Sequence, residues 1–144
     1  MGVWRRVAGL VLSLVLLCAC SQQSSATDDL IDALTETHSA IASSILAIEL
    51  YDRQRSTQAV TDTVLDDMAK QAVDAEGALE PISVGSEQIK SDRDAALAAI
   101  HAGVAALFTS RDDFSQHGAV GDTEGLKSAG QQVDDVLNQL RDSR

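Results

Sequence analysis

The chain has 144 residues, of which 44% are hydrophobic, 3% aromatic and 23% charged, with one proline. This length suits one ordinary domain, and the composition excludes collagen-like, disulfide-dense and proline-rich disordered proteins. The formal charge of −11 argues against DNA or RNA as a partner, because phosphate binding requires a basic face.

Residues 1–20 have the layout of a secretory signal peptide. Arg5 and Arg6 give a positively charged start, and residues 7–17 form an uncharged, mostly apolar run. This run is too short for a membrane-spanning helix, which needs about 20 apolar residues. The alternatives are a buried core helix or an uncleaved anchor, and the polar sequence QQSSATDD that follows disfavours burial.

The four residues Leu17-Cys18-Ala19-Cys20 come directly after the apolar run and resemble the lipobox of bacterial lipoproteins. The resemblance covers this signal alone. It implies that residues 1–19 are removed and that Cys20 receives a diacylglyceryl group and becomes the mature N-terminus. Cys18 is unusual at its place in the box, and it is the poorer acceptor because it would put bulky Leu17 at the cleavage site.

Processing at this point changes the charge and the available chemistry. Removal of residues 1–19 takes away Arg5 and Arg6 and leaves 125 residues with 9 basic and 22 acidic side chains, a formal charge of −13. The remaining cysteine carries lipid, so no disulfide, thiolate nucleophile or cysteine metal site is available. Anionic headgroups repel such an acidic body, so the lipid must hold the protein at the membrane.

The mature chain begins with residues 20–27, a small, polar stretch that we interpret as the lipidated N-terminus and a flexible tether. A helix is predicted over 28–53, because Ser25-Ala26-Thr27-Asp28 has the form of a capping box. Apolar residues then recur at steps of three and four if His38 is included, and others widen the stripe. The stripe consists of Ile31, Leu34, His38, Ile41, Ile45 and Ile48, widened by Leu30, Ala42 and Leu46.

Three further helices are predicted over residues 57–79, 86–110 and 122–141. Pro81 ends the first of them, because proline does not continue a helix interior. Each carries apolar residues at helical spacing. These are Leu65, Met68, Ala72, Ala75 and Leu79; then Leu97, Ile100, Val104 and Leu107, flanked by Ile89 and Phe108; then Leu126, Ala129, Val133, Val136 and Leu140.

The sequence therefore predicts an all-α domain over residues 28–144. Short connections favour an antiparallel, up-down-up-down four-helix bundle, and the many alanines allow its helices to approach closely. The alternative is a helical hairpin that completes its core by forming a dimer.

His38 stands where an isoleucine would fit in the first apolar stripe. A functional interpretation makes it a buried metal ligand or a pH switch. Di-metal bundles use Glu-x-x-His pairs, and none occurs in this sequence, so a structural histidine is the stronger interpretation. His101 is expected to be structural or exposed.

Residues 113–124 resemble the calcium loop of EF-hands, with Asp113, Ser115, Gly118 and Glu124 at the first, third, sixth and twelfth positions. His117 occupies the fifth position, where an oxygen ligand is expected. A loop between two helices, with glycines and an acidic cap, explains the same residues, so calcium stays the minor alternative.

Catalytic templates are missing from the sequence. It contains no Gly-x-Ser-x-Gly elbow, no glycine-rich phosphate loop and no free cysteine in the mature chain. The paired aspartates, such as Asp66-Asp67 and Asp134-Asp135, are expected on the solvated surface. We therefore expect no cofactor and no enzymatic activity.

These observations predict a lipid-anchored lipoprotein on the extracytoplasmic face of a bacterial cell envelope. Its helical domain is expected to bind or adapt an envelope protein or a cell-wall component. The alternative is a small-ligand or metal-binding envelope protein, using the bundle interior around His38 or weak calcium binding at residues 113–124. An alanine-rich closed core would favour the adaptor, and a polar cavity the ligand binder.

Overall fold

The computed structural model describes the backbone of residues 3–119 and 123–143, and within those ranges the side chains from Ser25 onward. Four helices occur in the order α1 (Val3–Asp52), α2 (Gln58–Gly77), α3 (Glu87–His117) and α4 (Glu124–Asp142). No strand is present in the described part of the chain. The prediction of an all-α, four-helix domain is confirmed.

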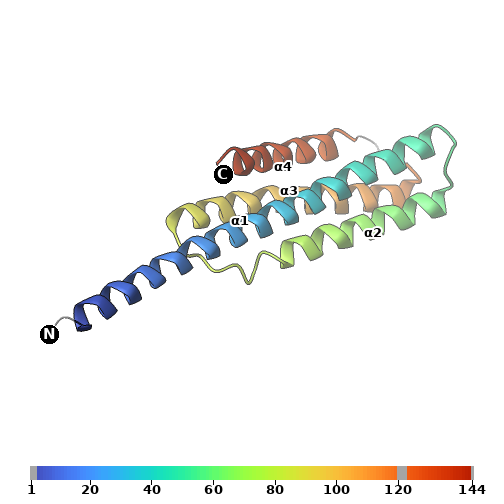
Figure 1. Ribbon diagram of the computed structural model, residues 1–144. Coiled ribbons are helices and arrows are strands. Elements are labelled where there is room, and N and C mark those ends of the chain that lie inside the picture. The colour runs from blue at the N-terminus through green and yellow to red at the C-terminus, as the bar shows by residue number, and fades with distance from the viewer. Residues whose placement is uncertain (1–2, 120–122, 144) are drawn as a thin grey trace.

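The four helices lie alongside one another, and along the colour ramp each helix runs back along the one before it (Figure 1). Over the described residues, α1 and α3 contact each other and both remaining helices, whereas α2 and α4 do not meet. The α1–α3 pair therefore forms the middle of the bundle, with α2 on one side and α4 on the other.

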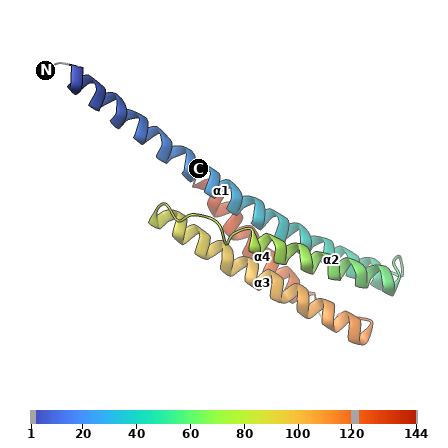
Figure 2. The same cartoon turned by 90° about the horizontal axis from the view of Figure 1, so that it is seen from below.

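Helix α1 begins far upstream of the predicted start. It is continuous through residues 20–27, which the sequence predicted as a flexible tether, and through the predicted capping box. No proline or glycine interrupts residues 10–52, so nothing in the covalent structure stops the helix there. The first part of α1 projects past the other three helices in both views (Figures 1 and 2).

Two helix starts carry side-chain caps. The Thr57 hydroxyl oxygen accepts a hydrogen bond from the Val60 N–H at 3.4 Å, and Ser86 accepts one from the Ile89 N–H at 3.2 Å. Each satisfies a backbone donor that the first turn leaves unpaired. The predicted starts of these two helices are therefore confirmed.

The predicted end of the third helix is wrong. Helix α3 does not end near Ser110 but continues to His117, where Gly118 adopts a left-handed φ of 64° and donates its N–H to the Phe114 carbonyl. The added turns bury Phe114 completely, and its ring meets Tyr51 edge-on with centroids 5.0 Å apart. This burial explains why the helix continues to the next glycine.

Small residues occupy the closest contact in the bundle. A Cβ atom on Gly103 of α3 would lie 2.9 Å from Thr37 Cγ2 and 3.2 Å from Ile41 Cδ1 of α1, and one on Gly130 of α4 would lie 3.3 Å from Ile41 Cγ2. Three helices thus meet around Ile41 because two of them present no side chain there. The core around this point is rich in alanine, as the sequence predicted.

Candidate functional site

The predicted anchor, Cys20, lies within the N-terminal half of α1. Its side chain lies outside the described residues. Among the described side chains of α1, Ser25 is exposed, Ala26 is partly buried against the core, and Leu30, ten residues after Cys20, is the first that is fully buried. Within the described part of the chain, no helix is both long enough and apolar enough to cross a membrane.

The structure contradicts the placement of His38 in the apolar seam. Its side chain is exposed, and the neighbouring Thr37 is fully buried in its place. The Thr37 hydroxyl donates to the Ala33 carbonyl at 3.0 Å, so it enters the core without an unpaired polar group. The buried face of α1 is therefore rotated by about one residue from the predicted stripe, and Ala42 and Leu46 are exposed.

A bundle interior built around His38 is accordingly not present. Buried hydroxyls on α1 and α2 have partners within the protein: Ser44 donates to the Ala40 carbonyl at 2.9 Å, and Thr61 pairs with Ser56 at 3.1 Å. Among the described residues, no buried side-chain nitrogen or oxygen lacks a hydrogen-bond partner. The polar groups of the core are thus engaged with the protein itself.

The calcium interpretation of residues 113–124 also disagrees with the structure. Asp113 and Ser115 lie on the regular last turns of α3, where residues two apart point to opposite sides of the helix. Ser115 donates to the Asp112 carbonyl at 3.2 Å, and Glu124 pairs with Lys127 at 2.8 Å. The helix therefore prevents these side chains from converging on one ion.

Part of that segment, residues 120–122, lies outside the described residues. Over the rest of the described chain, no group of three or more histidine, cysteine, aspartate or glutamate side chains is placed to hold a metal ion.

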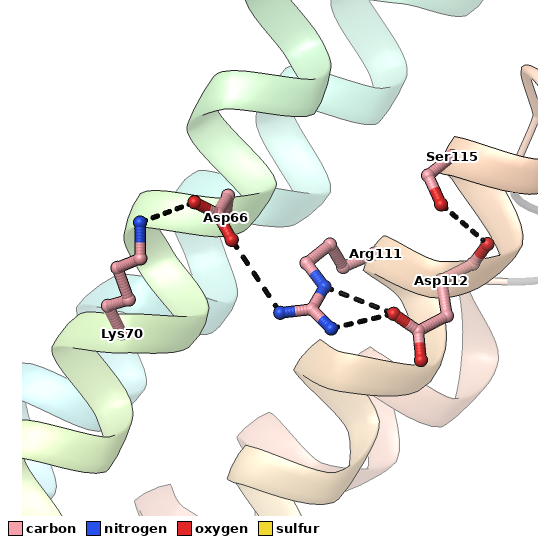
Figure 3. A network of polar contacts seen from close by, with 5 residues as sticks. All are labelled: Asp66, Lys70, Arg111, Asp112 and Ser115. Carbon is pink, nitrogen blue, oxygen red and sulfur yellow. Dashed lines mark hydrogen bonds and ion pairs between the residues drawn. The ribbon is translucent and has the colours of Figure 1, made fainter.

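A polar network links α2 to α3 (Figure 3). Asp66 of α2 accepts a hydrogen bond from Lys70 one turn later, and Arg111 of α3 reaches across to it with Nη1 3.6 Å from Asp66 Oδ1. The hydrogen bond from Lys70 lowers the pKa of Asp66, and the positive charges of Lys70 and Arg111 add to this effect. Asp66 in turn raises the pKa of Lys70.

Arg111 is held in place from three sides. Besides Asp66, it donates to Asp112 Oδ1 from Nη2 at 2.8 Å, and its guanidinium carbon lies 4.5 Å from the centre of the Phe108 ring. A cation held over an aromatic face is favoured electrostatically. Because Arg111 contacts Asp66, Asp112 and Phe108 of its own chain, this network has the character of a link between helices rather than of a ligand site.

A second pair joins the same two helices. His101 Nε2 of α3 lies 2.6 Å from Glu76 Oε1 of α2, and the histidine side chain is 62% exposed. His101 is expected to be structural or exposed, and the structure shows an exposed side chain that pairs with a neighbouring helix. The sequence could not reveal its partner, because the two residues come from different helices.

The paired aspartates lie mostly on the surface, as predicted. Asp29, Asp67, Asp112, Asp134 and Asp135 are exposed. The exception among the acidic residues is Asp92, which is 7% exposed and accepts a hydrogen bond from Gln88 Nε2 at 2.8 Å. Gln88 and Asp92 lie one helical turn apart, so this hydrogen bond is internal to α3.

Comparisons with known proteins do not extend these observations, since no family model, curated protein or solved structure matches the chain.

Proposed function

We propose that this protein is a lipoprotein, anchored by lipid on Cys20 at the extracytoplasmic face of a bacterial cell envelope. Its helical domain acts as a non-enzymatic binding or adaptor module for an envelope protein or a cell-wall component. The observation that carries the proposal is the sequence Leu17-Cys18-Ala19-Cys20 directly after an apolar run that is too short to span a membrane.

The position of Cys20 relative to the packed domain supports this proposal. Lipidation requires the cysteine to be accessible and the domain to fold without the preceding residues. Among the described side chains, Ala26 is the first that packs against the core and Leu30 is the first that is fully buried, and the first part of α1 projects from the bundle (Figure 1).

The character of the core supports the adaptor over the ligand binder. Alanine, leucine and isoleucine fill it, and its buried hydroxyls bond within the protein. The exposed side chain of His38 and the diverging side chains of Asp113 and Ser115 also favour the adaptor, because the ligand-binding alternative relied on these residues.

Substitution of the acceptor tests the anchor. We expect Cys20→Ala to leave the membrane fraction, either released or retained as unprocessed precursor. Each buried lipid CH₂ contributes about 0.8 kcal/mol to membrane affinity, and two acyl chains are needed for stable anchoring. Cell fractionation, with mass spectrometry of the mature N-terminus, measures the outcome.

Cys18→Ala is the matched control, because it changes the other cysteine of the box and leaves the acceptor in place. We expect it to stay lipidated at Cys20 and membrane-bound. If Cys20→Ala is cleaved and still sediments fully with membranes, or if Cys18→Ala alone abolishes lipidation, the proposal is wrong.

A further inference from the structure

The two ends of the bundle differ in their distance from the anchor. In both views, α1 leaves the bundle at the end where the α2–α3 loop (residues 78–86) and the C-terminal end of α4 lie (Figures 1 and 2). We call this the near end. The opposite end, formed by the α1–α2 turn (residues 53–57) and the C-terminal end of α3, is the far end.

The chain between the anchor and the near end is short. Ten residues separate Cys20 from Leu30, which corresponds to about 15 Å as the helix that the structure shows. Even fully extended, ten residues reach at most about 35 Å. Helix α3, with 31 residues, is about 46 Å long. The tether is therefore shorter than the bundle it holds.

The α2–α3 loop at the near end is held by buried side chains and by hydrogen bonds to α3. Leu79 is fully buried there and Ile82 is 8% exposed. Arg93 of α3 donates from Nε to the Leu79 carbonyl at 3.2 Å and from Nη2 to the Glu80 carbonyl at 3.5 Å. These contacts fix the α2–α3 loop against α3, so the loop keeps its place at this end.

Negative charge opposes contact of any side of the bundle with anionic headgroups, and the near end is no exception, because Glu80 and Glu87 are exposed there. All four helices expose carboxylates along their length, so each side would bring negative charge to anionic headgroups. The exposed acids include Asp32 and Glu36 on α1, Asp62 and Asp74 on α2, Asp94 on α3 and Asp134 and Asp135 on α4. The short tether, and not the charge, therefore selects the near end.

We infer that the anchored bundle stands end-on at the membrane, with the α2–α3 loop toward the lipid headgroups and the α1–α2 turn facing away from them. This inference rests on the proposed lipidation of Cys20. The surface available to a partner at the greatest distance from the bilayer is then the far end, whose described residues include Arg53, Gln54, Arg55 and His117, all exposed.

Energy transfer to labelled lipids tests this posture. Lipid occupies the only native cysteine of the mature chain, so Ser83→Cys at the near end and Gln116→Cys at the far end each supply a single free thiol. Both side chains are exposed and make no hydrogen bond in the structure. Each lipidated variant, carrying a donor dye, is reconstituted into phosphatidylcholine–phosphatidylglycerol vesicles with acceptor-labelled headgroups.

We expect transfer from position 83 to exceed transfer from position 116 severalfold. A long Gly-Ser insertion between Ser24 and Ser25 should bring the ratio toward one, because it frees the bundle from the short tether. Circular dichroism of each variant checks that the helices are retained.

Three results would contradict the inference, and they distinguish its failure from a failure of the proposed lipidation of Cys20. Equal transfer from both positions, with the protein bound to vesicles, means that the bundle lies flat or tumbles. That result contradicts the end-on posture and leaves the proposed lipid anchor uncontradicted. A high ratio that the insertion does not change means that the tether does not set the posture. Protein that stays unbound and shows no transfer contradicts the lipid anchor itself.

Discussion

Gly103 controls how closely α1 and α3 approach. An added Cβ would lie 2.9 Å from Thr37 Cγ2, and Thr37 cannot rotate away without losing its bond to the Ala33 carbonyl. Overpacking costs about 1–3 kcal/mol, and alanine regains up to about 1 kcal/mol of helix propensity. We therefore expect Gly103→Ala to lower the free energy of unfolding by about 1–2 kcal/mol, measured by urea denaturation of the soluble chain from Ser21 onward.

Gly125→Ala on α4 is the matched control, because no atom lies within 4 Å of a Cβ at that position. Its free energy of unfolding should stay unchanged or rise by up to about 1 kcal/mol. A Gly103→Ala protein as stable as the parent would mean that the helices do not meet as closely as described.

Asp66 makes a contribution to stability that depends on pH. Because its hydrogen bond with Lys70 and the nearby positive charges lower its pKa in the folded protein, its contribution is present above about pH 4 and is lost as pH falls through the folded pKa. The raised pKa of Lys70 acts in the other direction: its contribution is present below about pH 10 and is lost as pH rises through the folded value.

We therefore expect Asp66→Asn to lower stability slightly and equally across neutral pH, and the difference from the parent to vanish in acid. The effect is small because both side chains are largely exposed. Urea denaturation at several pH values measures it, with the exposed Asp74→Asn as control. A deficit that persists below the folded pKa of Asp66 would show that charge is not its cause.

Single side chains also define where the elements begin. Ser86 caps α3 through its bond from the Ile89 N–H, whereas Thr123 at the start of α4 makes no side-chain cap bond. Loss of such a cap typically costs about 1 kcal/mol. We expect Ser86→Ala to lower the thermal midpoint of unfolding and Thr123→Ala to leave it nearly unchanged. Equal effects of the two substitutions would contradict the assigned caps.

Most of the helical architecture was predictable because local signals mark it. Pro81 marks the end of α2, and the hydroxyls of Thr57 and Ser86 mark the starts of α2 and α3. The predicted end of α3 is wrong because the prediction places Phe114 in a loop, although Phe114 lies seven residues after the buried Leu107. That spacing, two helical turns, is the signal that could have found it.

The buried faces were harder to predict than the helices themselves. The sequence pattern favoured large aliphatic residues, yet the centre of the bundle takes small ones: Thr37 and Ser44 on α1, Ala96 and Gly103 on α3. The larger Leu97 and Val104 flank this centre and are only partly buried. A hydroxyl that donates a hydrogen bond to a carbonyl of its own helix can occupy a buried position in place of an apolar side chain. A prediction based on the spacing of hydrophobic residues does not identify such a position as buried.

Sequence reasoning sees contacts only between residues that adjoin in the chain. The proposed lipobox is a run of four residues, so the sequence alone is enough to propose it. The pairs Asp66–Arg111 and Glu76–His101 join helices through residues 45 and 25 positions apart, and only the fold reveals them. The calcium interpretation disagrees with the structure at Asp113 and Ser115 for a related reason: both lie on a continuous helix, and the helix decides where their side chains point.

At the scale of the whole molecule, excess negative charge opposes compactness. Residues 20–144 carry 22 acidic and 9 basic side chains, and only a few of the acids have ion-pair partners among the described residues. Repulsion between carboxylates therefore outweighs attraction within pairs. Salt screens both kinds of interaction, with a Debye length of about 8 Å at 0.15 M. Because the repulsions are more numerous than the attractions, screening should stabilise the folded protein overall.

We expect the thermal midpoint of unfolding to rise with sodium chloride concentration. Salt also acts on any protein through its exclusion from the surface, so two double variants isolate the charge effect. Asp29→Asn with Asp32→Asn removes two exposed charges and should raise the midpoint at low salt and flatten its rise. Gln131→Glu with Gln132→Glu adds two on exposed positions of α4 and should do the opposite. A midpoint that falls with salt, or identical slopes in the two variants, would show that self-repulsion does not limit the stability of this bundle.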